Sequence, residues 1–277
     1  CADLDVDFDR CGSYVVAVTE EDKATLAELL ERGKRNRVPG LQVIDGVEMR
    51  RREPMITDQV AGALYAPTAG LVDPFDLCIG AAECAVLNGV QLLLDTRVTG
   101  LLRHGPQVTG VRTTRGDLAS SWVVNAAGLW ADDIMRYAGL DALTITPRKG
   151  EYFVLDRLAA QIVRNVLFPC PTPVSKGIMV TRTIHGNVML GPNAVDTLSK
   201  NDGATTAPGL NEVMAGALRL IPALDSRLVI RTFAGLRAAG NTQDFLIDAP
   251  AERPGLLVLA GIESPGLTAS PAIAERA

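Results

Sequence analysis

Two junctions between an apolar strand and a helix hold the residues with the clearest chemical use. Residues 123–128 read Val-Val-Asn-Ala-Ala-Gly, and residues 260–268 read Ala-Gly-Ile-Glu-Ser-Pro-Gly-Leu-Thr. Small residues at the carboxyl end of a buried strand let a ligand approach the backbone. The helix that follows presents unpaired N–H groups to an anionic group of a cofactor. Spacing alone leaves a second interpretation open, which is an ordinary tight turn.

One histidine and one arginine are the candidates for proton transfer and anion binding. His185 lies where one strand turns into the next, and an unperturbed imidazole pKa of about 6.5 suits a base that takes a hydroxyl proton. Arg237 lies in an apolar strand, where a buried guanidinium must pair with an acid or bind an anion. A surface turn is the alternative for His185, and a structural ion pair is the alternative for Arg237.

Three further residues carry weaker signals. His104 precedes Gly and Pro, which predicts an exposed turn. Arg148 and Lys149 precede Gly-Glu-Tyr. They either line the same cavity as Arg237 or lie in a solvated turn, and the solvated turn is the simpler expectation.

The elements that position these residues alternate, which predicts a mixed α/β fold. Strands are expected at 13–18, 91–94, 122–125 and 256–260, in a meander over 96–114, and in a strand-rich stretch from 151 to 190. Helices are expected at 19–32, 73–88, 129–137, 208–220 and the C-terminus, with Asp73 and Pro74 as a strong helix start. The run 256–260 is apolar throughout, the signature of a strand buried on both faces.

Composition excludes several classes of protein. The chain has 277 residues, 47% of them hydrophobic, which suits one large or two medium domains. The net charge of −5 gives no basic footprint, so no nucleic acid partner is expected. No apolar run approaches the ~20 residues needed to span a bilayer. The odd, scattered set of cysteines fits reduced, buried thiols of a cytoplasmic protein better than disulfides or a metal site: Cys1, Cys11, Cys78, Cys84 and Cys170.

The ends and one missing motif predict a shortened chain. The sequence opens at Cys1 without Met and stops at Ala277, inside an expected helix. It contains no Gly-x-Gly-x-x-Gly, the turn that binds a dinucleotide pyrophosphate. We therefore expect a truncated product.

Five stretches, taken in order, resemble the D-amino-acid-oxidase-like FAD-dependent oxidoreductases. That group includes glycerol-3-phosphate dehydrogenases, L-2-hydroxyglutarate oxidases, and glycine or sarcosine oxidases. The resemblance runs nearly end to end and is nearest to anaerobic-type glycerol-3-phosphate dehydrogenase homologues, with the hydroxyglutarate oxidases next. The similar stretches are 125–132, 147–152, 191–194, 233–237 and 261–268.

The resemblance implies a fold of two interleaved domains. An FAD/NAD(P)-binding-like domain without its N-terminal βαβ unit would take residues 63–139 and 236–277. A substrate domain with a mixed sheet would take residues 1–62 and 140–235.

The same resemblance implies roles for particular residues. Arg237 looks like the family's substrate-binding Arg, and His185 looks like a His that precedes a Gly-Thr-Thr-Asp-like strand. Val98 would lie near the adenosine, the turn after residue 125 near the phosphate and ribose, and the loop 261–268 over the flavin ring. The implied cofactor-binding residues are Val98, Ala126, Ala127, Gly128, Trp130, Gly261, Ile262, Glu263, Ser264, Pro265, Gly266, Leu267 and Thr268.

The implied activity is oxidation of a small anionic hydroxy compound. A hydride would pass from the substrate carbon to flavin N5, His185 would take the hydroxyl proton, and Arg237 would hold the anion. Glycerol 3-phosphate is the first candidate substrate and L-2-hydroxyglutarate the alternative. The sequence does not identify the electron acceptor, and it leaves room for peripheral membrane association of the parent enzyme and for a homodimer.

Two departures from the family pattern weaken two different parts of this expectation. Glu263 and Ser264 stand where enzymes of the aerobic type carry a Lys, which weakens the prediction that the substrate's anion is a phosphate. The absent Gly-rich turn removes charge-assisted hydrogen bonds worth ~1.5–3 kcal/mol each. This chain by itself is therefore expected to bind FAD poorly, and a flavin-free, non-catalytic fragment is the alternative of another class.

Overall fold

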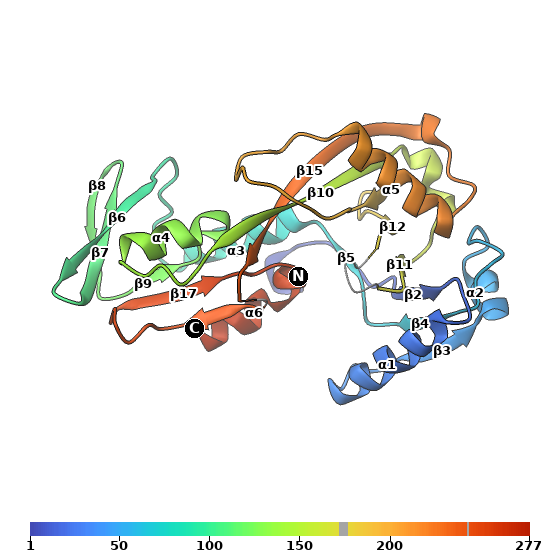
Figure 1. The fold of residues 1–277 in the computed structure, drawn as a ribbon, viewed down its shortest axis with the longest axis horizontal. Coiled ribbons are helices and arrows are strands. Elements are labelled where there is room, and N and C mark those ends of the chain that lie inside the picture. The colour runs from blue at the N-terminus through green and yellow to red at the C-terminus, as the bar shows by residue number, and fades with distance from the viewer. Residues whose placement is uncertain (172–176, 243) are drawn as a thin grey trace. The chain divides into compact units, whose positions relative to one another are not determined.

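The computed structural model describes residues 1–171, 177–242 and 244–277 (Figure 1). They form two compact units. The first unit comprises residues 1–88, 150–194 and 203–235, and the second comprises residues 89–149, 195–202 and 236–277. Residues 63–88 thus group with the first 62, whereas the predicted division placed 63–139 in the FAD domain. Which unit holds the cofactor and which the substrate stays a prediction.

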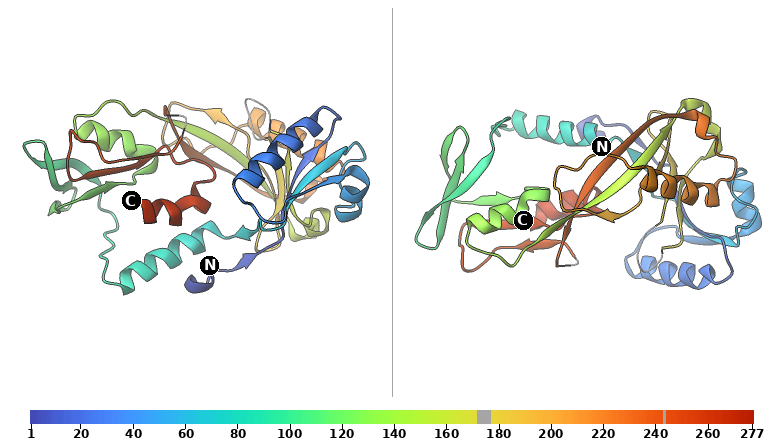
Figure 2. Two further views of the ribbon diagram at one scale, coloured as in Figure 1. Left: turned by 90° about the horizontal axis from the view of Figure 1, so that it is seen from below. Right: turned by 45° about the horizontal axis from the view of Figure 1, so that its top comes forward.

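Two long strands contribute to both units. They are β10 (Ile145–Leu155) and β15 (Val229–Gly240), which pair with each other. The right-hand view of Figure 2 shows them as neighbouring long ribbons, β10 in yellow-green and β15 in orange-red. Each crosses a unit boundary within the strand, β10 after Lys149 and β15 after Gly235.

The first unit is built on a mixed sheet in the order β10-β13-β12-β11-β2-β4-β3. Its central strands are apolar because both of their faces are covered, and Val16, Leu167, Val180 and Leu190 are fully buried. The remaining strands are β1 (Phe8–Asp9), β2 (Ser13–Ala17), β3 (Gln42–Asp45), β4 (Gly62–Ala66), β5 (Leu71–Val72), β11 (Val166–Pro169), β12 (Met179–Arg182) and β13 (Val188–Gly191).

The helices of this unit follow the predicted pattern with shifted ends. They are α1 (Asp22–Arg35), α2 (Gly46–Arg52), α3 (Pro74–Leu87) and α5 (Ala207–Leu220), with short 3-10 turns at Ala2–Leu4, Arg157–Ile162 and Ser226–Leu228. Helix α1 begins at Asp22 with Glu21 as its N-cap, and the Thr19 hydroxyl, which was predicted to cap the helix, accepts the Asp22 N–H at 3.2 Å. Helix α5 buries Val213, Ala217 and Leu220 in the core.

The second unit contains two small sheets. One has the order β16-β17-β9, and the other, β6-β7-β8, is the predicted meander. The strands are β6 (Val98–His104), β7 (Gln107–Thr113), β8 (Gly116–Ala119), β9 (Val123–Asn125), β14 (Val195–Asp196), β16 (Leu246–Asp248) and β17 (Leu256–Ala260). A 3-10 turn (Gly128–Trp130), α4 (Ala131–Tyr137) and α6 (Gly266–Arg276) complete it, and Leu256, Val258, Ala131 and Met135 lie in its core.

Three predictions were wrong. Residues 91–94 form no strand and are exposed, because their apolar run has no neighbouring strand to pair with in the described structure. Strand β17 is not buried on both faces, since Leu257 and Leu259 are only half-buried. None of the five free cysteines is buried: Cys1, Cys78 and Cys84 are exposed, and Cys11 and Cys170 are half-buried. Part of the strand-rich stretch, 172–176, lies outside the described residues.

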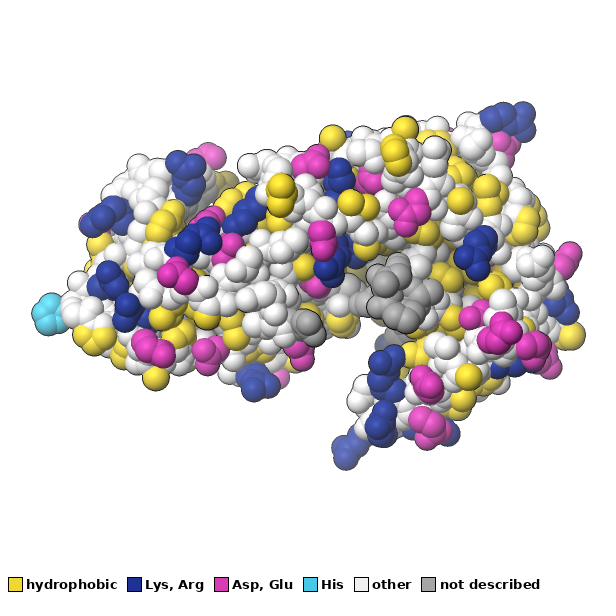
Figure 3. All heavy atoms as spheres, in the orientation of Figure 1, with side chains coloured by type: hydrophobic (Ala, Val, Ile, Leu, Met, Phe, Trp, Pro, Cys, Tyr) yellow, Lys and Arg dark blue, Asp and Glu magenta, His cyan; other side chains and the backbone are white. Residues whose placement is uncertain are grey.

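The surface carries both signs of charge. On the face shown in Figure 3, Lys and Arg side chains are interspersed with Asp and Glu side chains. Among the described residues, no helix is both long enough and apolar enough to cross a membrane.

Candidate functional site

The carboxyl ends of β9 and β17 form the first part of the candidate site. The strands pair in parallel, with Val258 opposite Asn125, so both lead out of the sheet at the same edge. Strand β9 continues into Ala126 and β17 into Gly261. The structure thus brings the two predicted junctions together around a cavity of about 250 Å³. The lining residues are Ala126, Gly128, Leu259, Ala260, Gly261, Ile262, Gly266, Ser270, Ile273 and Ala274.

Glycines shape this cavity for backbone reasons. Gly128 has φ 55° and Gly261 has φ 64°, a conformation that costs other residues steric strain. A Cβ at Gly266 would lie 2.5 Å from Cγ2 of Ile262. The first turn of α6 therefore packs this closely against the loop after β17 only because residue 266 is glycine. These three positions explain why both junctions are rich in glycine.

Asn125 fixes the shape of the first junction, a role that was not predicted from the sequence. Its side chain is 2% exposed. The Nδ2 group donates to the carbonyl of Ala131 at 2.9 Å, and Oδ1 accepts the Ala127 N–H at 3.3 Å. The sequence signal that could have identified Asn125 is an amide side chain at the end of an apolar strand, because a buried polar side chain must find hydrogen-bond partners.

Helix α6 contributes Gly266 from its first turn and Ser270 from its second turn to the lining of the cavity. Its N-cap is Pro265, and no side chain caps the helix. First-turn N–H groups have no partner within a helix, and they carry the positive end of its dipole. The N–H groups at this terminus can therefore donate hydrogen bonds to an anionic or hydrogen-bond-accepting group of a ligand.

The other predicted cofactor residues lie outside this lining. Val98 begins β6 and pairs with Thr113 in the separate β6-β7-β8 sheet. Trp130 is 46% exposed, and its backbone N–H donates to the carbonyl of Ala127 at 3.0 Å. Their predicted contacts with a cofactor stay predictions, as do those of Glu263, Ser264, Pro265, Leu267 and Thr268.

Charged side chains gather on β10, β14 and the loop before α6. Arg148 makes a two-point contact with Asp196, with Nε 2.7 Å from Oδ1 and Nη2 3.3 Å from Oδ2. Its Nη1 lies 3.5 Å from Oε1 of Glu263. The hydrogen bond from Arg148, helped by the charge of Arg237, holds the pKa of Asp196 below its usual value. Arg237 on β15 is half-buried, and its role in binding an anion stays a prediction.

The prediction of a solvated turn at Arg148 and Lys149 was wrong. Both residues belong to β10, and Lys149 is 5% exposed. Its Nζ lies 3.0 Å from Oδ2 of Asp202. A β-strand was hard to predict here because Pro, Arg, Lys and Gly interrupt the apolar alternation.

His185 lies in the first unit, in the turn between β12 and β13. Its side chain is 57% exposed, and Nε2 lies 2.9 Å from Oδ2 of Asp73, the N-cap of α3. The hydrogen bond from His185 lowers the pKa of Asp73. His104 is exposed at the end of β6, beside the turn where it was expected.

Asp73 caps α3, and its replacement by alanine is expected to cost ~1–2 kcal/mol of unfolding free energy. Its carboxylate accepts the N–H groups of Phe75 and Asp76 at 2.7 and 3.2 Å. His185→Ala should cost less, because that imidazole is exposed. Urea unfolding of the two variants checks the order, and equal losses would contradict a capping role.

The same carboxylate predicts a pH dependence. A lowered pKa in the folded state means that ionised Asp73 stabilises the fold above its unfolded pKa of about 3.9. This contribution is lost as the pH falls through the folded pKa. Asp73→Asn keeps a capping oxygen without the charge, so the stability gap between wild type and variant should close below about pH 4. A gap that persists in acid would exclude the carboxylate as its cause.

In the described ranges, no group of three or more His, Cys, Asp or Glu side chains could hold a metal ion.

The comparison with protein families decides what this arrangement is. The family model described as FAD dependent oxidoreductase (DAO) matches residues 1–277. The chain belongs to this family. The expected mixed α/β fold of FAD-dependent oxidoreductases is thereby confirmed.

Two individual relatives in the DAO family indicate which of its enzymes the chain resembles. The chain is 38% identical over 275 residues to a glycerol 3-phosphate dehydrogenase of Caloramator mitchellensis, covering 99% of this chain and 57% of that protein. It is 32% identical over 199 residues to L-2-hydroxyglutarate dehydrogenase of Escherichia coli, covering 70% of this chain and 46% of that protein. The chain therefore spans about half the length of these curated relatives.

A solved structure of the DAO fold matches the chain as well. It is the dithionite-reduced L-alpha-glycerophosphate oxidase of Mycoplasma pneumoniae with FAD bound. The TM-score is 0.91 with 27% sequence identity, and the match covers 98% of this chain and 72% of that one.

The cavity at the ends of β9 and β17 fits the family's cofactor. Most of its lining side chains are small, glycines with positive φ bring backbone to its wall, and one side of α6 from Gly266 to Ala274 lines it. Ala126, Gly128, Gly261, Ile262 and Gly266 would hold FAD there. When bound, FAD supplies the hydride acceptor.

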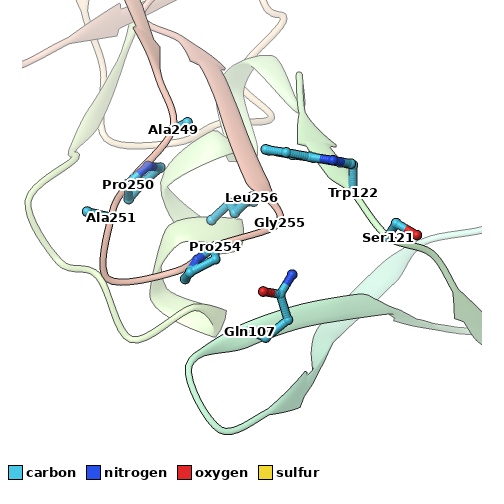
Figure 4. A pocket seen from close by; sticks show the side chains of 9 residues that line it. All are labelled: Gln107, Ser121, Trp122, Ala249, Pro250, Ala251, Pro254, Gly255 and Leu256. Carbon is cyan, nitrogen blue, oxygen red and sulfur yellow. The ribbon is translucent and has the colours of Figure 1, made fainter.

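A second cavity of about 310 Å³ lies at the opposite, amino ends of the same strands (Figure 4). Trp122 precedes β9, and Gly255 precedes β17. In open α/β sheets, ligands bind outside the carboxyl ends of strands. The Trp122 cavity is therefore a poorer candidate for the DAO cofactor. Its lining comprises Gln107, Ser121, Trp122, Ala249, Pro250, Ala251, Pro254, Gly255 and Leu256.

Proposed function

We propose that the protein is an FAD-dependent dehydrogenase or oxidase of a small anionic hydroxy compound, most specifically glycerol 3-phosphate. The observation that carries this proposal is the match over 99% of the chain to a glycerol 3-phosphate dehydrogenase. The cavity between the two glycine-rich junctions supports it from the structure. L-2-hydroxyglutarate is the second candidate substrate, supported by a match over 70% of the chain.

Each proposed role belongs to a side chain with suitable chemistry. Arg237 binds the substrate's anionic group, since a guanidinium offers paired donors to phosphate or carboxylate oxygens. The turn after β9 and the loop from Gly261 to Thr268 hold the cofactor, with that loop against the flavin ring.

His185 is the proposed base that takes the hydroxyl proton. If Nε2–H donates to Asp73, the lone pair stays on Nδ1, which is then the atom that accepts the proton. His185→Gln should lower kcat far more than it changes KM. An unchanged kcat would leave His185 only as the partner of the α3 cap.

We also propose a cytoplasmic location, with the five cysteines as free thiols. The electron acceptor is a separate molecule of unassigned class. Association with a membrane surface and homodimer formation are proposals for the whole protein, to be tested by vesicle sedimentation and by light scattering.

Turnover with two substrates tests the proposed function. The full-length protein is reconstituted with FAD and assayed with an artificial electron acceptor. We expect a higher kcat/KM for glycerol 3-phosphate than for L-2-hydroxyglutarate, and the reverse order would assign the second candidate. The 277-residue chain is titrated with FAD in parallel. A chain that stays colourless after gel filtration would exclude catalysis by this chain alone.

A further inference from the structure

The second unit holds an arginine fixed between two acids. Arg148 on β10 faces Asp196 on β14 in the strand register, and the side chains make the two-point contact at 2.7 and 3.3 Å. The third nitrogen, Nη1, lies 3.5 Å from Glu263 in the loop before α6. Two nitrogens of this guanidinium thus donate to one carboxylate and the third lies within ion-pair distance of another, and arginine also binds phosphate through such paired donors.

A second arginine acts on the same carboxylate. Strand β15 pairs with β10, and the positive charge of Arg237 on β15 contributes to the lowered pKa of Asp196. Arg148, Asp196 and Glu263 therefore form a group of directly paired charges, and the positive charge of Arg237 acts on Asp196 as well. A phosphate dianion that replaced both carboxylates would leave the same charge balance.

The ion pairs in this group are easy to exchange. The exposed side-chain fractions are 37% for Arg148, 53% for Asp196 and 28% for Glu263. Solvent-accessible ion pairs typically add ~0–1 kcal/mol to stability, and the two-point contact between Arg148 and Asp196 is the stronger kind of such pair. A ligand anion can therefore replace an acid here with little loss of folding free energy.

We propose that Arg148 is a second anion-binding residue beside Arg237, and that Asp196 is an internal competitor that the ligand's phosphate group displaces. This inference rests on the proposed function, because that function supplies the reason for a phosphate site. It goes beyond that function by assigning Arg148 a role in substrate specificity and Asp196 a role in weakening the binding of the anion. Glu263 would be released with Asp196, which couples anion binding to the loop before α6.

Calorimetric titration of the 277-residue chain with inorganic phosphate tests the proposal without flavin. Asp196→Asn should bind phosphate about fivefold more tightly than wild type. Glu263→Gln should change affinity in the same direction. Arg148→Gln should bind about tenfold more weakly. Acetate is titrated into the same variants. In Arg148→Gln the affinity for acetate should fall less than the affinity for phosphate, because a monoanion needs to displace only one carboxylate.

The matched control is Asp225→Asn. Asp225 pairs with Arg227 at 2.7 Å, and the substitution changes net charge by the same amount at a site in the first unit. The control should leave phosphate affinity unchanged. If Asp225→Asn tightens binding as much as Asp196→Asn, or if Arg148→Gln binds phosphate like wild type, the proposal is wrong. Circular dichroism confirms that each variant is folded.

Failure of this inference can be distinguished from failure of the proposed function. If Arg148→Gln leaves phosphate affinity unchanged while the full-length protein oxidises glycerol 3-phosphate, only the role of Arg148 is overturned. If the phosphate series behaves as predicted while glycerol 3-phosphate is not oxidised, the anion site stands and the proposed function falls.

Discussion

Arg237→Leu is expected to lower kcat/KM for glycerol 3-phosphate by about 10²- to 10³-fold in the full-length protein, because it removes one or two charge-assisted hydrogen bonds of ~1.5–3 kcal/mol each. Most of the loss should appear as a raised KM if the anion is bound equally in the ground state and the transition state. Steady-state kinetics measures both constants.

Two variants make this result specific. Arg237→Lys keeps the charge but loses the planar guanidinium, so its activity should lie between the activities of the wild type and of Arg237→Leu. Arg231→Leu removes an exposed arginine from the same strand, β15, and should have wild-type kinetics. If Arg237→Leu behaved like Arg231→Leu, Arg237 would be a structural residue.

Gly209→Ala is expected to destabilise the first unit by ~3 kcal/mol or more, the cost of forcing a buried carboxyl group out of its hydrogen bonds. A Cβ at this position would lie 1.5 Å from Oε2 of Glu151 and 2.9 Å from Nδ2 of Asn193. Glu151 and Asn193 are each 1% exposed, so their side chains have no room to move aside.

The network around Gly209 explains the size of this effect. The Glu151 N–H donates to Asn193 Oδ1 at 2.9 Å, and Asn193 Nδ2 donates to Glu151 Oε2 at 3.0 Å. The N–H of Thr206, the N-cap of α5, donates to Glu151 Oε1. The buried carboxyl group thereby ties β10 to the start of α5, so displacing it would break both connections.

Chemical denaturation measures the loss, and Gly203→Ala is its control. A Cβ at Gly203 would meet nothing within 4 Å, so that substitution should change stability little. A Gly209→Ala chain as stable as the Gly203→Ala chain would mean that the Glu151 side chain can leave its site at little cost.

Local signals in the sequence predicted the elements better than their partners. Asp73 and Pro74 marked the start of α3 correctly, because an N-cap and a first-turn proline act within a few residues. Residues 91–94 have the composition of a strand but form none, since a strand also needs a neighbour. No local pattern reports whether that neighbour exists.

The candidate site depends on contacts between distant parts of the chain. Glycine-rich junctions could be found from the sequence, but their meeting follows from the parallel pairing of β9 with β17. The contact between Arg148 and Asp196 joins residues 48 positions apart, and the contact between Glu151 and Asn193 joins residues 42 apart. A single sequence does not identify such pairs, so it could offer a cavity shared by Arg148 and Arg237 only as one of two alternatives, beside a solvated turn.

The most direct test of the proposed function is anaerobic reduction of the flavin by substrate. The full-length protein is loaded with FAD, oxygen is removed, and glycerol 3-phosphate is added while the visible absorbance of the oxidised flavin is recorded. We predict that the band bleaches in proportion to added substrate, and that Arg237→Leu requires far more substrate for the same bleaching. A band that stays unchanged with saturating glycerol 3-phosphate, in a protein whose flavin dithionite still bleaches, would contradict the proposed function.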